Sequence, residues 1–206
     1  MKCSEGLEEN ASSSLFYFFG RENPRCIQLE EGDEMKRALF LLVVFILGII
    51  FLFSPIFNVI SFEETRTNNP QSYYINVSKE NNFNIRYTHS IHLTDVLETY
   101  EITDSNQIKL LSMEYEDVAI GMPAHAEEGQ TLTYNNGNYK LEFSDQTLDT
   151  FTLYIGDISQ KLAIIYEGKT YDLKKTLERG SAFLFEIKRI SLFDKLRGVV
   201  MVHENG

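Results

Sequence analysis

The stretch from Phe83 to Ile102 decides the fold that this sequence predicts: Phe-Asn-Ile-Arg-Tyr-Thr-His-Ser-Ile-His-Leu-Thr-Asp-Val-Leu-Glu-Thr-Tyr-Glu-Ile. Apolar and polar residues alternate with a period of two in both halves, which is typical of strands with one buried face. The residues that share the predicted buried face are Phe83, Ile85, Tyr87, His89 and Ile91 in the first half and Val96, Glu98, Tyr100 and Ile102 in the second. The two halves therefore predict an antiparallel β-hairpin.

A four-residue loop over residues 92–95 would set the register of this hairpin. It would place His89 opposite Glu98 and Tyr87 opposite Tyr100, with every apolar residue on one face. An imidazole and a carboxylate would then lie side by side on an apolar face, where each needs a partner. Two interpretations of His89 and Glu98 remain open. The pair either fixes the strand register, or its carboxylate orients the imidazole for proton transfer or for binding an anion.

Further alternating segments and turn signals follow on both sides of the hairpin. The expected strands are Tyr73–Val77, Ile108–Tyr115, Leu148–Ile155, Lys161–Tyr166, Lys169–Leu173 and one through Phe183, Phe185 and Ile187. Asn136-Gly137 and Glu167-Gly168 are expected to be tight hairpin turns. The pattern predicts an all-β domain over residues 73–190, an antiparallel β-sandwich or barrel. A short helix over Ser191–Arg197 and a tail complete residues 191–206.

The segment before the β domain predicts a membrane helix. Ala38 to Phe53 has no polar side chain, and residues 38–57 are long enough to cross the hydrocarbon layer as a helix. We expect an uncleaved signal-anchor helix over residues 35–59 and a polar tether over residues 60–72. Lys36 and Arg37 precede the helix, so the N-terminus is expected in the cytoplasm and the β domain outside it.

Residues 1–34 have two interpretations. They are either a short cytoplasmic tail or an upstream segment that is not translated, if translation starts at Met35. The two cysteines of the chain, Cys3 and Cys26, both lie in this segment. The later domain therefore has neither a disulfide framework nor a cysteine-ligated zinc site.

Composition limits the partners of the chain. Its 206 residues hold 19 Lys and Arg against 30 Asp and Glu, a formal net charge of −11. Nucleic-acid binding depends on neutralising phosphates, so we expect no nucleic-acid partner. We also expect no cofactor and no metal. The spacing of His89 and His92 argues against a metal site, because on a strand it points their rings to opposite faces unless the chain turns between them.

The sequence also argues against a serine hydrolase. If Ile108 lies opposite Ile102, Ser112 falls opposite Glu98, and the carboxylate then lies between serine and histidine. Activation of a serine nucleophile needs the histidine in the middle. The chain has no Gly-x-Ser-x-Gly motif either. We therefore expect no catalytic residues.

A resemblance rests on three motifs. The run Phe83-x-Ile85-x-Tyr87-x-His89-Ser90-Ile91, then Glu98-x-Tyr100, then Gly121-Met122-Pro123, resembles a bacterial family known as domain of unknown function 1850. The resemblance covers about Asn76 to Ile190. Members are small exported proteins, usually membrane-anchored, often encoded beside TRAP transporters that use a TAXI solute-binding protein. Val96 stands where many members have tryptophan, and Ala119 where many have glycine.

The resemblance implies a binding or interaction domain that is accessory to a TRAP-type (TAXI) solute transport system. Its partners would be the transporter membrane subunit or solute-binding protein. The face that carries the motifs is expected to contact such a subunit or to bind a small anionic solute. The candidate binding residues are His89, Ser90, Glu98, Tyr87, Tyr100, Gly121, Met122 and Pro123. Two alternatives are a cell-surface hydrolase that uses His89 and Glu98, and a structural envelope protein without a small-molecule ligand.

Overall fold

The computed structural model describes residues 31–118 and 121–204. Most of the expected N-terminal tail, with both cysteines, lies outside the described residues, as does Ala119.

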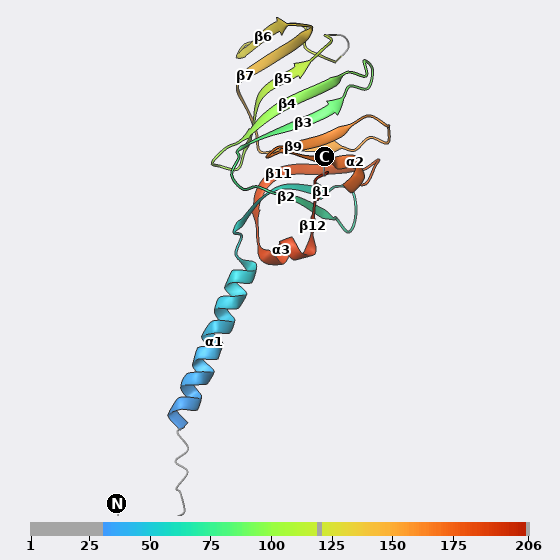
Figure 1. Ribbon diagram of the computed structural model, residues 1–206. Helices are drawn as coiled ribbons and strands as arrows, with labels where there is room; N and C mark the ends of the chain where they lie inside the picture. Colours follow the sequence, from blue (N-terminus) through green and yellow to red (C-terminus); the bar gives the residue numbers. More distant parts are fainter. Residues whose placement is uncertain (1–30, 119–120, 205–206) are drawn as a thin grey trace, which may run out of the picture. The chain divides into compact units, whose positions relative to one another are not determined.

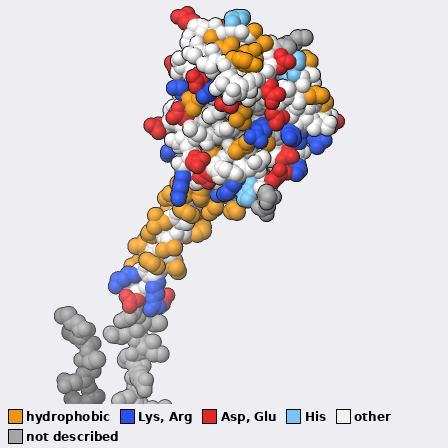
Figure 2. Space-filling model, turned by 45° about the horizontal axis from the view of Figure 1, so that its top comes forward, with side chains coloured by type: hydrophobic (Ala, Val, Ile, Leu, Met, Phe, Trp, Pro, Cys, Tyr) orange, Lys and Arg blue, Asp and Glu red, His pale blue; other side chains and the backbone are white. Residues whose placement is uncertain are grey.

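The N-terminal helix α1 (Glu31–Phe53) contains a stretch, Asp33–Phe53, that is long and apolar enough to cross a membrane. Figure 2 shows it as a nearly continuous hydrophobic surface with charged side chains at its base, whereas charges of both signs are scattered over the β domain. The helix ends where Ser54 donates its backbone N–H and its hydroxyl to the carbonyl of Ile50, at 2.9 and 2.6 Å. Pro55 follows and cannot continue the ladder. An anchor and a signal sequence are both compatible with such a helix.

The rest of the described chain forms two sheets, which confirms the expected all-β, mostly antiparallel fold behind one helix (Figure 1). The small sheet has the order β12 (Val199–Val200), β2 (Ser72–Asn76), β1 (Phe57–Glu64), β11 (Ala182–Ile190) and β8 (Thr150–Tyr154). The large sheet has the order β10 (Lys169–Asp172), β9 (Leu162–Tyr166), β3 (Asn82–Thr88), β4 (Asp95–Ile102), β5 (Ile108–Tyr115), β7 (Asn138–Leu148) and β6 (Gln130–Asn135). Two short helices, α2 (Leu173–Thr176) and α3 (Leu192–Arg197), complete the domain.

The main core lies between the two sheets. Phe62 and Phe185 of the small sheet meet edge to face at 5.2 Å between ring centroids. Phe83 of the large sheet stacks on Tyr100 at 5.2 Å and contacts Phe185 at 5.6 Å. Such aromatic contacts bury a large area with defined geometry. A second, smaller cluster is centred on the buried side chains of β4, β5 and β7, namely Val96, Tyr115 and Leu141.

The structure replaces the first half of the expected tether with a strand. β1 begins at Phe57, pairs with β2 on one side and with β11 on the other, and buries Val59, Ile60 and Phe62 completely. This strand follows the apolar helix so closely that the two read as one hydrophobic run in the sequence. The β domain therefore starts at residue 57, and only residues 65–71 connect β1 to β2.

The β3–β4 hairpin has the predicted faces but a different register. Tyr87 pairs with Val96 instead of Tyr100, which lies four residues further along the chain. The connection is a six-residue loop over residues 89–94, closed by a 2.8 Å hydrogen bond from the N–H of His89 to the carbonyl of Thr94. Because the shift is an even number of residues, the side chains within the two strands stay on their predicted faces, whereas His89 and Ile91 lie in the loop, where Ile91 is 57% exposed instead of buried. His89 and Glu98 are consequently not opposite each other.

A β-bulge changes the expected position of Ser112. Ile108 lies opposite Ile102 as predicted, but the register shifts between Thr99 and Tyr100. Met113 therefore lies opposite Glu98, and Ser112 lies opposite Thr99. A bulge adds one unpaired residue to one strand, which a regular alternation cannot reveal.

The two tight hairpin turns expected from the sequence, Asn136-Gly137 and Glu167-Gly168, are both present. Asn136 and Gly137 both have positive φ, at 50° and 88°, and the turn pairs Tyr134 with Tyr139. Glu167 and Gly168 have φ of 51° and 69°, the geometry of a type I′ hairpin turn. Helix α3 is also present, and Ser191 caps it in a reciprocal capping box with Asp194.

The position of β1 predicts where the folded domain begins. A chain that starts at Phe57 is expected to fold, whereas one that starts at Ser72, at β2, is not. Losing the burial of Val59, Ile60 and Phe62 removes about 1.5–3 kcal/mol per side chain, against a total stability of about 5–15 kcal/mol for a typical domain. Circular dichroism during heating measures this difference. A cooperative unfolding transition in the shorter chain would contradict the role given to β1.

Candidate binding cleft

The centre of the candidate site is a carboxyl group held by two tyrosines. The hydroxyl of Tyr100 donates to Oε2 of Glu98 at 2.7 Å, and the hydroxyl of Tyr87 lies 3.3 Å from Oε1. All three side chains point to the inner face of the large sheet, two from β4 and one from β3. Their grouping follows from the alternation of the strands and from the pairing of β3 with β4.

Burial dominates the ionisation of this cluster. It raises the pKa of the Glu98 carboxyl, and the hydrogen bonds from Tyr100 and Tyr87 counteract part of this rise. Burial, followed by the negative charge of Glu98, raises the pKa of both tyrosines. The tyrosine hydroxyls therefore keep their protons at neutral pH and act as donors to Glu98.

Glu98 and Tyr87 line a cleft of about 640 Å³. The cleft lies beside β8, the last strand of the small sheet, where that sheet stops and the large sheet continues past β3 and β4. Its other lining residues are Ile85, Thr88, Phe151, Leu153, Tyr154, Gly156, Asp157, Ile158, Gln160, Lys161, Leu162 and Lys174. The volume is in the range of small-molecule sites, and apolar walls with a few polar groups are their usual composition.

The polar groups of the cleft differ in sign and position. Glu98 comes from the sheet, whereas Asp157, Lys161 and Lys174 come from the β8–β9 loop and α2. Lys174 donates to the carbonyl of Ile158 at 2.8 Å. Burial lowers the pKa of Lys174, and the nearby positive charge of Arg179 lowers it further.

Gln160 adds an acceptor to the cleft. Its side-chain oxygen Oε1 is buried, and within the described chain no donor forms a hydrogen bond with it. A buried acceptor without a partner costs free energy, which a ligand that donates a hydrogen bond would recover.

The histidine of the motif lies outside this cleft. Nδ1 of His89 accepts long hydrogen bonds, at 3.4 Å, from the backbone N–H groups of Ile91 and His92 in its own loop. The rings of His89 and His92 stack at 5.1 Å, and Nδ1 of His92 lies 3.5 Å from the carboxylate of Asp117. The hydrogen bonds of Glu98 go to Tyr87 and Tyr100 instead. The motif thus divides into two groups of side chains.

The Gly121-Met122-Pro123 segment lies against the second group. Gly121 has a φ of 91°, and a Cβ placed there would lie 3.6 Å from Nε2 of His89. Met122 packs on the cluster of Val96, Tyr115 and Leu141. The hydroxyl of Tyr115 donates to the carbonyl of Pro123 at 2.6 Å. The segment therefore covers part of the large sheet, and its methionine is partly buried.

Ser90 is exposed in the β3–β4 loop and lines none of the cleft. In the residues that the structure describes, no group of three or more His, Cys, Asp or Glu side chains is placed to hold a metal ion.

Several cleft residues carry no motif that sequence analysis could use. Phe151 and Leu153 belong to an alternating strand that was predicted, but nothing in the sequence indicates that this strand is the edge of the small sheet. Gln160, Lys161 and Lys174 lie far from Glu98 in the chain and approach it only through the sheet order.

Comparison with known proteins identifies one family. Residues 83–173 match the model of a family described as "Domain of unknown function (DUF1850)". The matched segment runs from β3 to β10, so it contains the large sheet and β8, and every lining residue of the cleft except Lys174. No curated protein and no solved structure matches the chain. The resemblance carried by the His89, Glu98 and Gly121 motifs is thereby confirmed over residues 83–173, the segment that matches the DUF1850 family model.

Proposed function

We propose that this chain is a membrane-anchored, extracytoplasmic binding domain that holds a small amphipathic anion in the cleft beside β8. The observation that carries the proposal is the partly buried Glu98 carboxyl, with its two tyrosine donors, in the wall of a largely apolar cleft. An apolar body would fit between Ile85, Phe151 and Leu153. Its anionic group would meet Lys161 and Lys174.

The charge of Glu98 bears on such a ligand. An ionised Glu98 repels an anion, whereas a protonated Glu98 does not, and burial already favours the protonated form. Binding of an anion is therefore linked to proton uptake by Glu98. Affinity for the anion rises as the pH falls through the raised pKa of Glu98.

An uncleaved anchor is favoured by the short distance between α1 and β1. Only residues 54–56, Ser-Pro-Ile, separate the end of the helix from the first strand. A cleavage site for a signal sequence needs small residues at the positions before the cut, and the last residues before β1 are Phe53, Ser54, Pro55 and Ile56. A cut beyond residue 57 would remove part of β1. With α1 in the membrane, Lys36 and Arg37 favour a cytoplasmic N-terminus.

The transport role comes from the family resemblance. We propose that the domain is accessory to a TRAP-type (TAXI) system, presenting or sensing its solute next to the transporter membrane subunit or the solute-binding protein. The exposed β3–β4 loop, with Ser90 and Ile91, is a candidate contact for such a subunit, since Ile91 is 57% exposed.

The hydrolase alternative depends on a pair, His89 and Glu98, whose side chains have different partners. His89 lies in the loop cluster with His92 and Asp117, and Glu98 faces the cleft between two tyrosine hydroxyls. A general base acts within hydrogen-bond reach of the group it serves. We therefore favour binding over catalysis.

Blocking the mouth of the cleft is the direct test. Ile158→Trp adds bulk at a lining residue that is 48% exposed, and it is expected to abolish binding of the fluorescent anion 1-anilinonaphthalene-8-sulfonate. Ile91→Trp makes the same change at a residue outside the cleft and is expected to bind like the unchanged chain. Fluorescence titration measures both. Equal binding by the two variants would contradict a cleft site.

Charge variants test the ligand chemistry. Glu98→Gln is expected to strengthen binding of the same anion, and Lys174→Gln to weaken it, each by about two- to fivefold, or roughly 0.4–1 kcal/mol. The affinity of the unchanged chain should rise with falling pH, and that of Glu98→Gln should not. Weaker binding by Glu98→Gln would contradict the anion and favour a cationic ligand.

The raised pKa of Glu98 also predicts a pH dependence of stability. Its pKa in the folded state lies above the ordinary value of 4.5, so the folded state binds more protons than the unfolded state between the two values. The free energy of unfolding therefore falls as the pH rises through this window and then levels off. Denaturant titrations of the full chain in detergent should show this fall for the unchanged chain and a flatter profile for Glu98→Gln. If the free energy of unfolding instead rises across this window by the same amount in both chains, groups other than Glu98 cause the pH dependence of stability.

Purification from native membranes tests the transport role. The tagged full chain, extracted in mild detergent, is expected to co-purify with the transporter membrane subunit. The variant Ile91→Asp, changed in the exposed loop, is expected to recover less of that subunit. Mass spectrometry of the purified sample provides the measurement, with Val202→Asp as a matched change at a residue that is 79% exposed and outside the cleft. Recovery of the chain without a transporter subunit would remove the accessory role and leave the binding domain.

A further inference from the structure

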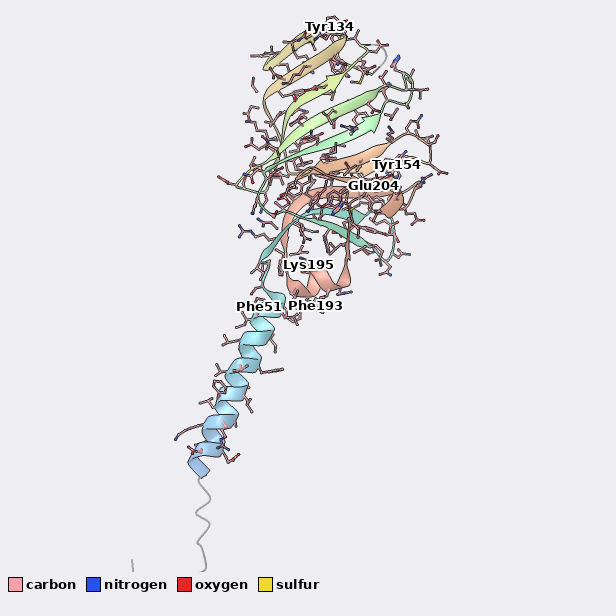
Figure 3. All side chains as sticks on the ribbon, viewed as in Figure 1. Phe51, Tyr134, Tyr154, Phe193, Lys195 and Glu204 are labelled. Carbon is pink, nitrogen blue, oxygen red and sulfur yellow. The ribbon has the colours of Figure 1, made fainter. Side chains whose placement is uncertain are left out.

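The end of the domain next to the anchor carries an unusual short helix. Helix α3 follows β11 through Ser191, and β11 ends at Ile190, which pairs with Phe57, the first residue of β1. Nζ of Lys195 lies 4.5 Å from the centre of the Phe57 ring. Helix α3 therefore lies beside the point where the chain enters the β domain (Figures 1 and 3).

Covalent geometry fixes how far this point lies from the membrane, if α1 spans it as proposed above. Four peptide steps from Phe53 to Phe57 extend to at most about 14 Å. The polar headgroup region on each side of the bilayer is roughly 5–7 Å thick. Because β1 has no longer tether, its first residue and the adjoining α3 stay close to the lipid headgroups.

The surface of α3 has the composition of an interfacial helix. Leu196 is 72% exposed, which is unusual for a leucine on a short helix of a folded domain. The cations on both sides of it, Lys195 and Arg197, lie over the rings of Phe57 and Phe193, at 4.5 and 5.4 Å. Apolar side chains flanked by Lys or Arg are typical of helices that lie in the plane of a membrane surface.

The charges around α3 also suit lipid phosphates. The chain carries a net charge of −11, yet α3 holds two cations, and its one acid, Asp194, is engaged in the capping box with Ser191. On the adjacent face of the small sheet, Lys188 already pairs with Glu63 and Glu186. Arg189 of β11, whose Nε donates to Oδ1 of Asn58 at 3.1 Å, adds a third cation to Lys195 and Arg197 on this side of the domain.

We propose that α3 is a membrane-surface foot, in which Leu196 enters the boundary between headgroups and acyl chains while Lys195 and Arg197 contact lipid phosphates. The occupant of this surface is the bilayer that holds α1. With the anchor and the foot both bound, the domain has two points of attachment and a restricted orientation above the membrane.

The test uses tryptophan fluorescence, because the chain contains no tryptophan. Leu196→Trp places a single reporter on α3. Tyr134→Trp places one at a similarly exposed site, 63% exposed, on β6 at the other end of the β domain (Figure 3). Each full chain is reconstituted in vesicles of phosphatidylcholine and phosphatidylglycerol with brominated acyl chains, which quench a tryptophan that reaches the hydrocarbon boundary. Flotation of the vesicles shows independently whether the chain is anchored.

The expected result is strong quenching of Leu196→Trp and little quenching of Tyr134→Trp. Adding Lys195→Gln and Arg197→Gln to Leu196→Trp should weaken the quenching, most clearly at low salt. If the chain floats with the vesicles and both reporters are quenched equally little, the foot is wrong while the anchor stands. If the tryptophan fluorescence of Leu196→Trp is blue-shifted but brominated lipid does not quench it, another part of the protein covers α3. That result also overturns the proposal. A chain that does not float overturns both the anchor and the foot.

Discussion

The β domain depends on the burial of β1 between β2 and β11. Ile60 and Phe62 of this strand reach the core between the sheets, where Phe62 meets Phe185. In the small sheet β2 and β11 pair directly with this strand, β12 is attached through β2, and β8 forms one side of the cleft only because β11 holds it. The strand that α1 leads into is thus also the strand around which the domain is built.

The alternation of residues predicted much of this fold. It identified the β3–β4 and β5 strands, two type I′ turns and the short helix that Ser191 caps. It missed β1, because a buried strand next to an apolar helix has no polar break to separate the two. It also misplaced the β3–β4 register, since an alternation with a period of two sets the face of each residue but leaves the loop length undetermined.

The candidate site was predicted only in part, for a related reason. Tyr87, Glu98 and Tyr100 were expected on one face and do form one cluster. The expected pairing of His89 with Glu98 depended on the register, and the row with Ser112 depended on the absence of a bulge. The cleft itself is formed by β8 and the β8–β9 loop, and their place beside β3 follows from the order of strands in two sheets, which no local pattern encodes.

The three-residue connection between α1 and β1 has a consequence for how this protein meets its partners. A domain on a long flexible linker searches a hemisphere above the membrane, and its effective concentration falls as the linker lengthens. If α1 spans a membrane as we propose, a domain attached this closely moves with the lateral diffusion of its anchor and meets other membrane proteins in two dimensions. Under this proposal its cleft would stay within a narrow range of heights above the membrane, and its partners would be proteins whose own openings lie in that range.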